Sequence, residues 1–204
     1  LCPCKAPMGG VTEGIVKWSG QPASTCWDPA LSPNGDTVFA IARWRTLWWN
    51  EEYEKTPGEL RAIRAADGVQ LWKYSFGFSS VDWSPIPTQG KPLVSRDGVA
   101  VYVGSNQDFC LHAVRASDGS QLWKYVTGGW VRSRPAQTHQ GHNEATLFIG
   151  SGDRKLHAVR AVDGHKKWEY SANGEVYGNP VVSHDDTVVY ITSVHNYMVH
   201  AVNV

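Results

Sequence analysis

The sequence predicts an all-β fold, a β-propeller built of four-stranded antiparallel blades. The first observation is that nearly the same fifteen residues occur at 60–74, 111–125 and 156–170, with their tryptophans 51 and then 45 residues apart. The second is that each copy reads as two strands joined by a tight Asp-Gly turn. The third is that two further strand signals separate successive copies. Four short strands in a repeat of this length are typical of a propeller blade.

The first two strands of each repeat come before the fifteen-residue unit. The first strand opens at a proline, and the second is a run of apolar residues at 36–40, 99–104, 145–150 or 187–191. A continuous apolar run of this length predicts a strand that is covered on both faces. Asn34-Gly35, Asp97-Gly98 and Asp185-Asp186 precede three of these runs and suit the positive φ or Asx turns of hairpins. The four prolines are Pro29, Pro85, Pro135 and Pro180.

The third and fourth strands form the fifteen-residue unit itself. Its turn carries Gly68, Gly119 or Gly164, and its last strand carries Trp72, Trp123 or Trp168. We expect each tryptophan to fill the wedge between neighbouring blades, which buries roughly 150–250 Å².

Partial copies of the repeat stand near both ends of the sequence. Residues 13–18 reproduce the last strand, with Gly14 and Trp18 at the repeat positions, and 197–203 reproduce the third strand. The two pieces are complementary, so we predict four blades closed by the N-terminal strand. The alternative is an arc of a larger propeller of seven or eight blades. The expected domains are an extension at 1–12 and a propeller at 13–204, with repeats at about 19–75, 76–126, 127–171 and 172–204 plus 13–18.

Composition excludes several classes of partner. The 19 basic residues equal the 19 acidic residues, which argues against a nucleic-acid partner. The apolar runs are too short to cross a bilayer, so we expect no transmembrane segment. Four cysteines are too few for a disulfide framework, and Cys2, Cys4 and Cys26 leave open a single bridge, free thiols or a metal site without a regular zinc spacing.

The repeated Leu-x-Ala-x-x-Ala-x-Asp-Gly-x-x-x-Trp resembles the tryptophan-docking motif of PQQ-like β-propellers, usually Ala-x-Asp-x-x-Thr-Gly-x-x-x-Trp. The runs Pro-Val-Val-Ser at 180–183 and Val-Tyr-Val-Gly-Ser at 101–105 resemble the family's other two strands. The family includes quinone dehydrogenases, non-catalytic scaffolds of bacterial outer-membrane assembly and sensor domains of membrane kinases. The resemblance implies protein partners and an exported, periplasmic or organelle-lumenal location.

The quinone dehydrogenases of this family hold calcium or a lanthanide with Glu, Asn and Asp, and they use a catalytic Asp and an adjacent Cys-Cys disulfide. No two cysteines are adjacent here, and a four-bladed ring has little room on its axis. We therefore expect no cofactor and no catalysis. Pyrroloquinoline quinone with calcium is the alternative, and a larger ring would strengthen it.

Residues just before the blade prolines are expected to face the axial funnel. They could bind a charged small ligand or an inserted peptide, or Asp–Arg pairs could simply close the ring. The candidates are Trp27, Asp28, Asp82, Trp83, Arg132, Arg134, Tyr177 and Asn179.

Histidines occur in two patterns. A position that repeats in every blade is predicted to be structural, because a catalytic group is needed only once; it is occupied by His112, His157 and His200. A separate loop carries His139, His142 and Glu144, a weak metal-site candidate because a loop does not fix their spacing.

An insertion at 42–58 is rich in aromatic residues, and we expect it either to bind a partner or to cover its own blade. Its interface candidates are Trp44, Trp48, Trp49 and Tyr53. The sequence therefore predicts a non-catalytic propeller that serves as a protein-interaction scaffold or subunit of an assembly. The alternatives are a fragment of a quinone dehydrogenase and a ligand-sensing or carbohydrate-binding propeller.

Overall fold

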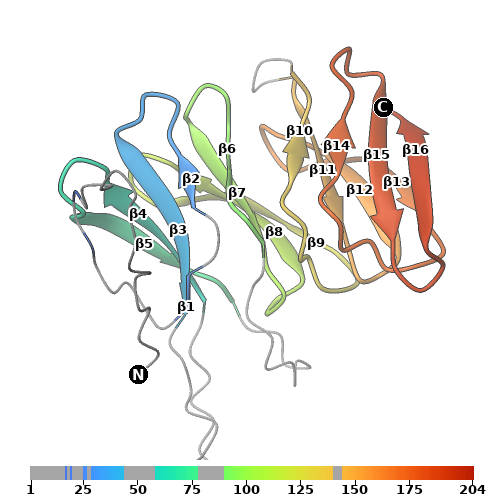
Figure 1. Ribbon diagram of the computed structural model, residues 1–204, viewed down its shortest axis with the longest axis horizontal. Helices are drawn as coiled ribbons and strands as arrows, with labels where there is room; N and C mark the ends of the chain where they lie inside the picture. Colours follow the sequence, from blue (N-terminus) through green and yellow to red (C-terminus); the bar gives the residue numbers. More distant parts are fainter. Residues whose placement is uncertain are drawn as a thin grey trace, which may run out of the picture.

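The computed structural model is all-β, as predicted, and describes residues 17, 19, 25–26, 29–43, 58–77, 90–139 and 144–204. Within these residues the strands form four antiparallel sheets in chain order. The sheets stand side by side along the long axis, from the blue and teal sheet at one end to the red sheet at the other (Figure 1). No helix in the described part of the chain has the length and hydropathy needed to cross a membrane.

Each sheet is built from consecutive strands joined by hairpins. The first contains β1 (Thr25–Cys26), β2 (Ala30–Leu31), β3 (Thr37–Arg43), β4 (Glu59–Arg64) and β5 (Gln70–Ser75). The second contains β6 (Leu93–Val94), β7 (Ala100–Gly104), β8 (Cys110–Arg115) and β9 (Gln121–Val126). The third contains β10 (Ala136–Gln137), β11 (Thr146–Gly150), β12 (Lys155–Arg160) and β13 (Lys166–Ser171), and the fourth β14 (Val181–Val182), β15 (Val188–Ser193) and β16 (Met198–Asn203).

The shortest strand of each sheet lies on the inner side of the row. These strands are β2, β6, β10 and β14; β2 contacts β6, and β10 contacts β14. The strand that carries the apolar run is wholly buried in the second and third sheets, where all five residues of β7 and of β11 are buried. In the fourth sheet burial alternates along β15, and Tyr190 is 44% exposed, so the expected cover on both faces is not met there. The inner edges of neighbouring sheets therefore meet, while the later strands of each sheet extend outward.

Glycines with positive φ make the tight turns of the fifteen-residue unit. Gly68, Gly119 and Gly164 have φ of 77°, 75° and 72°, a conformation that costs a side chain free energy. A Cβ at Gly119 would lie 2.6 Å from the ring of Trp72 in the preceding sheet. This turn position therefore requires glycine for two reasons: its φ is positive, and the indole of the preceding sheet leaves no room for a Cβ.

The hydrophobic core is divided into three clusters, one at each boundary between sheets. At the first boundary Phe39 and Leu60 pack with Val101 and Val114, and Trp72 lies against the cluster. The indole Nε1 of Trp72 donates a hydrogen bond to the carbonyl oxygen of Ala116 in the next sheet at 3.0 Å. Trp123 repeats this with Ala161 at 3.0 Å. The first two boundaries thus combine apolar packing with one part-buried indole hydrogen bond, and at the third Trp168 packs against the apolar cluster.

The predicted closure of four blades is not found. The first and fourth sheets lie at opposite ends of the molecule (Figure 1), and the fourth sheet has three strands within the described residues. Equivalent residues fill each boundary, so every sheet packs on the preceding one in a similar way. Four sheets packed in this way leave the first and the fourth sheet apart. Segment 13–18, which was to supply the closing strand, falls almost wholly outside the described residues.

Candidate functional site

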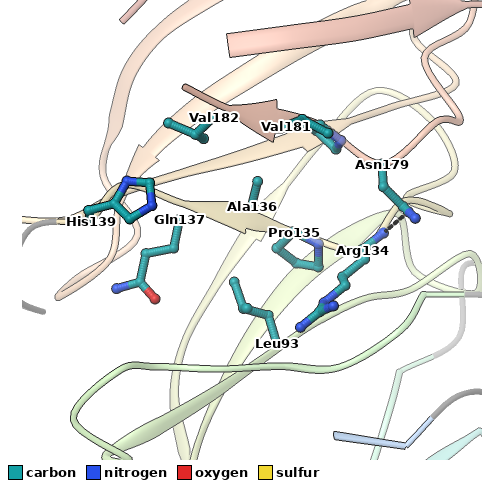
Figure 2. A pocket seen from close by; sticks show the side chains of 10 residues that line it. Leu93, Arg134, Pro135, Ala136, Gln137, His139, Asn179, Val181 and Val182 are labelled. Carbon is teal, nitrogen blue, oxygen red and sulfur yellow. Dashed lines mark hydrogen bonds between the residues drawn. The ribbon is translucent and has the colours of Figure 1, made fainter. Parts of the chain in front are cut away.

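A groove of about 350 Å³ lies where the inner strands of the second, third and fourth sheets meet. Figure 2 shows Ala136 and Gln137 on β10 in its middle, with Val181 and Val182 on one side and Leu93 on the other. The remaining lining residues are Arg134, Pro135, His139, Asn179 and Pro180. The groove therefore has apolar walls and a few polar groups, the composition expected of a binding site.

Prolines place the two inner strands of the groove. Pro135 comes directly before β10, and Pro180 directly before β14; each fixes its φ and supplies no N–H. The backbone N–H of Arg134 donates to Oδ1 of Asn179 at 2.8 Å (Figure 2). Two of the predicted funnel residues are thus brought together and tie the third sheet to the fourth.

The amide of Gln137 is a polar group without a partner. Its Nε2 and Oε1 are both buried and have no hydrogen-bond partner among the described residues. A buried amide that makes no hydrogen bond costs about 1–3 kcal/mol. Gln137 lines the groove, so a small rotation of its side chain would let a ligand in the groove supply both a donor and an acceptor to the amide.

Arg132 lies between two aromatic rings at the same inner side. Its guanidinium carbon is 4.4 Å from the centroid of the Trp130 ring and 4.7 Å from that of Tyr177. Cation–π contacts of this kind are worth about 0.5–2 kcal/mol each. Burial raises the pKa of the Tyr177 hydroxyl, and the charge of Arg132 partly opposes that rise. Two of the predicted funnel residues, Arg132 and Tyr177, thus form a stack with Trp130 that joins the third and fourth sheets.

The ionisable side chains that line the groove are Arg134 and His139. His139 is held by the next sheet: its Nδ1 lies 2.7 Å from Oδ1 of Asp186, and its backbone N–H donates to Oδ2 of Asp186 at 2.8 Å. Of the predicted metal cluster of His139, His142 and Glu144, His142 lies outside the described residues. His139 thus joins the third sheet to the fourth, and the metal cluster stays a prediction.

The repeated histidines lie in hydrogen-bonded chains that cross the boundaries between sheets. The hydroxyl of Tyr74 is 3.0 Å from Nδ1 of His112, and that of Tyr125 is 3.0 Å from Nδ1 of His157. The other ring nitrogen faces an aspartate four residues earlier: Nε2 of His112 is 3.0 Å from Asp108. His157 and Asp153 repeat this at 2.9 Å.

A strained residue turns each aspartate back toward its histidine. Phe109 and Arg154 directly follow Asp108 and Asp153, and have φ of 58° and 70°. Such values are uncommon for residues other than glycine. In the fourth sheet Tyr197, with φ of 54°, follows Asn196 in the same way. There Nε2 of His200 is 2.9 Å from Oγ of Ser193 instead.

Burial and hydrogen bonding act against each other on the acidic members of these chains. Burial alone would raise the pKa of the Asp153 carboxyl, but hydrogen bonds from His157 and from the Gly128 N–H outweigh it and lower the pKa to about 2. The pKa of Asp108 is also lowered, since bonds from His112 and Ser105 outweigh burial. Burial and the Asp108 charge raise the pKa of the Cys110 thiol to about 12.

Several predicted site residues lie outside the described residues. The funnel candidates in this group are Trp27, Asp28, Asp82 and Trp83, and the interface candidates are Trp44, Trp48, Trp49 and Tyr53. The proposed Asp–Arg pairs across the axis therefore stay a prediction.

Two features were missed from the sequence. Gln137 and Leu93 line the groove, although alternation along a strand that begins at Pro135 could have placed Gln137. Asp108, Cys110 and His112 lie together in the second sheet, with their ligand atoms within 4.8 Å of one another. Alternation along β8 places Cys110 and His112 on one face, but Asp108 precedes the strand and no sequence signal placed it beside them.

Comparison with known proteins identifies the repeat. The family model described as "Outer membrane protein assembly factor BamB" matches residues 56–142 and 136–203. Among solved structures, BamB from Moraxella catarrhalis is similar in fold, with a TM-score of 0.62 and 19% sequence identity. The match covers 89% of this chain and 46% of the BamB chain, so the chain spans less than half the length of that relative. No curated protein matches the chain.

Proposed function

Because the chain belongs to the PQQ-like repeat family whose model describes the outer membrane protein assembly factor BamB, we propose that it is a non-catalytic propeller scaffold that binds a protein partner. The partner would be a component of an outer-membrane protein assembly machinery, and the chain would act in an exported compartment. The family description and the fold support this assignment.

The buried, unpartnered amide of Gln137 is the observation that carries the proposal. An extended peptide segment in the groove would offer backbone N–H and C=O groups to this amide, and it would cover Val181, which is 60% exposed. Leu93 and Val182 would supply the apolar walls. Main-chain hydrogen bonds of this kind give affinity in peptide recognition, and the flanking pockets give specificity.

We also propose that the sheets are an arc of a ring of seven or eight blades. The chain covers 46% of the BamB chain that it resembles, and the four sheets form an open row (Figure 1). The domain division at 13 stays a prediction, and the joining of 172–204 with 13–18 into one repeat would apply only to a closed ring of four blades. The aromatic insertion at 42–58 would be a second contact, which the replacements Trp48→Ala and Trp49→Ala would test.

The alternative functions fit the described groove poorly. A quinone held by calcium needs carboxylates, and none of the lining residues of the groove is Asp or Glu. A carbohydrate site needs exposed aromatic faces, but the rings of Trp130 and Tyr177 are covered by the guanidinium of Arg132. These observations favour a peptide over a quinone or a sugar.

Site-specific photocrosslinking in the source cell tests the scaffold proposal. A photoreactive amino acid would replace Val181 in the groove, or Val126 at the end of β9 as the matched control; these valines are 60% and 63% exposed. We expect crosslinks from position 181 to a subunit of an outer-membrane assembly machinery at several times the yield from position 126. Equal yields, or no product at 181, would contradict the proposal.

The replacement Gln137→Leu separates binding from stability. Removing two unpartnered buried atoms should leave the free energy of unfolding unchanged or raise it by about 1 kcal/mol, while the crosslink from position 181 should weaken. A variant that loses stability but keeps the crosslink would show that Gln137 has a structural role only. Chemical denaturation and crosslink yield are the two measurements.

A further inference from the structure

A second site lies at the boundary between the first and second sheets, away from the groove. The hydroxyl of Tyr74 donates its single hydrogen to Oε1 of Gln121 at 2.7 Å. The same hydroxyl oxygen is 3.0 Å from Nδ1 of His112, so it must accept the hydrogen of Nδ1–H. In a neutral imidazole this leaves a lone pair on Nε2.

That lone pair faces another acceptor. Nε2 of His112 is 3.1 Å from Oδ1 and 3.0 Å from Oδ2 of Asp108. Two acceptors at this distance require a cation between them, either a proton or a metal ion. The carboxylate is available for this role, because its side chain is only 11% exposed and already turned toward the ring.

A thiol completes the cluster. Cys110 is a free, buried cysteine, and its Sγ, a carboxylate oxygen of Asp108 and a ring nitrogen of His112 all lie within 4.8 Å of one another. Sulfur, imidazole nitrogen and carboxylate oxygen are the three ligand types of zinc sites. We propose that Asp108, Cys110 and His112 bind a zinc-class divalent metal ion.

The chemistry of the surroundings suits this ion. Tyr74 fixes the tautomer of His112 from its far nitrogen, as residues around bound metals commonly do. The Cys110 thiol would release its proton to solvent as the sulfur–metal bond forms. The ammonium of Lys124 is a nearby positive charge that would repel a metal ion. The two negative charges of the Cys110 thiolate and the Asp108 carboxylate exceed it.

The neighbouring repeat provides an internal control. The third sheet has the same aspartate and histidine at 2.9 Å, but the position of Cys110 is taken by Lys155, whose ammonium is paired with Glu169 at 2.6 Å. A cation at that position replaces the thiol, so this repeat should bind no metal. A proton between Asp153 and His157 is sufficient there.

Titration of the metal-free, full-length protein with Co²⁺ and then Zn²⁺ tests the proposal. We expect one equivalent of Co²⁺ to give thiolate charge-transfer absorption in the near ultraviolet, which Zn²⁺ removes. The other three cysteines could also bind cobalt, so the measurement is repeated on Cys2→Ser/Cys4→Ser/Cys26→Ser, which keeps Cys110. The band must persist in that variant.

Point variants complete the test. In the background that keeps only Cys110, Cys110→Ser should abolish the band, and Asp108→Asn and Tyr74→Phe should weaken cobalt binding about tenfold or more. Asp153→Asn, the matched change in the third sheet, should leave binding unchanged. The proposal is overturned if that background binds no cobalt, if the band survives Cys110→Ser, or if Asp153→Asn weakens binding as much as Asp108→Asn does.

Discussion

The strands β12 and β16 have similar sequences but very different surroundings. Both contain His-Ala-Val, at 157–159 and at 200–202. In β12 Ala158 and Val159 are 0% exposed, whereas in β16 the equivalent Ala201 is exposed and Val202 is half-buried. β12 lies between β11 and β13, while β16 pairs with β15 alone in the described residues. The repeat thus encodes the strand, but its neighbours determine its burial.

The largest expected effect comes from truncating equivalent side chains in the two strands. Leu156, 0% exposed in β12, and Val199 in β16 both directly precede the repeated histidine. We expect Leu156→Ala to lower the free energy of unfolding by about 4 kcal/mol, because it leaves a cavity. Val199→Ala should cost well under ~1 kcal/mol in chemical denaturation. An equal loss for Val199→Ala would mean that β16 is covered in the native protein.

The turn at the second boundary gives the next effect. A Cβ at Gly164 would lie 2.5 Å from the Trp123 ring, whereas one at Gly35 would meet nothing within 4 Å. Both glycines have positive φ, of 72° and 78°. We expect Gly164→Ala to cost about 3 kcal/mol and Gly35→Ala about 1 kcal/mol, the backbone part alone. If the two variants unfold at the same urea concentration, the contact with Trp123 contributes nothing.

The carboxyl group of Asp153 in the third sheet should make the free energy of unfolding depend on pH. The pKa of Asp153 is lowered to about 2 in the folded protein, below about 3.9 in an unfolded chain. Its contribution is therefore present above pH ~4 and is lost as the pH falls through ~2. Asp153→Asn should cost about 2 kcal/mol at pH 7 and remove this part of the acid dependence, as followed by denaturation from pH 7 to 2.

In the fourth sheet the equivalent residue is Asn196, which does not titrate. The matched variant Asn196→Ser should therefore keep the acid dependence of the parent protein. If it removes that dependence, or if Asp153→Asn leaves the dependence intact, Asp153 is not the group responsible.

The smallest effect is expected from removing single hydroxyls. Tyr125 and Tyr170 hydrogen-bond Nδ1 of His157 and His200 at 3.0 and 3.1 Å. Loss of one such bond costs about 1 kcal/mol when the partner stays buried. Tyr125→Phe should reach that value, because His157 is 3% exposed, and Tyr170→Phe should cost about half as much. Thermal unfolding would contradict this if the order were reversed.

The sequence was sufficient for the family, the all-β class and the four-stranded antiparallel sheets. The spacing of the tryptophans and the Asp-Gly turns carries that information, because both are local and repeat. Closure of four blades was not found in the described residues, and it depends on how neighbouring sheets are placed and not on any single strand. The Cys110 cluster was missed for a local reason: the positive φ of Phe109 re-aims Asp108, and no pattern of residue types reports that conformation.

The indole hydrogen bonds from Trp72 to Ala116 and from Trp123 to Ala161 give the molecule a direction. The first sheet holds the second and the second holds the third, and within the described residues neither bond skips a neighbour, so cooperativity should travel from one sheet to the next, as in linear repeat proteins. Amide hydrogens of β16 should exchange first with solvent deuterium, and those of β7 and β11, which are buried between sheets, should exchange last. The order of exchange would then report the order in which the sheets unfold.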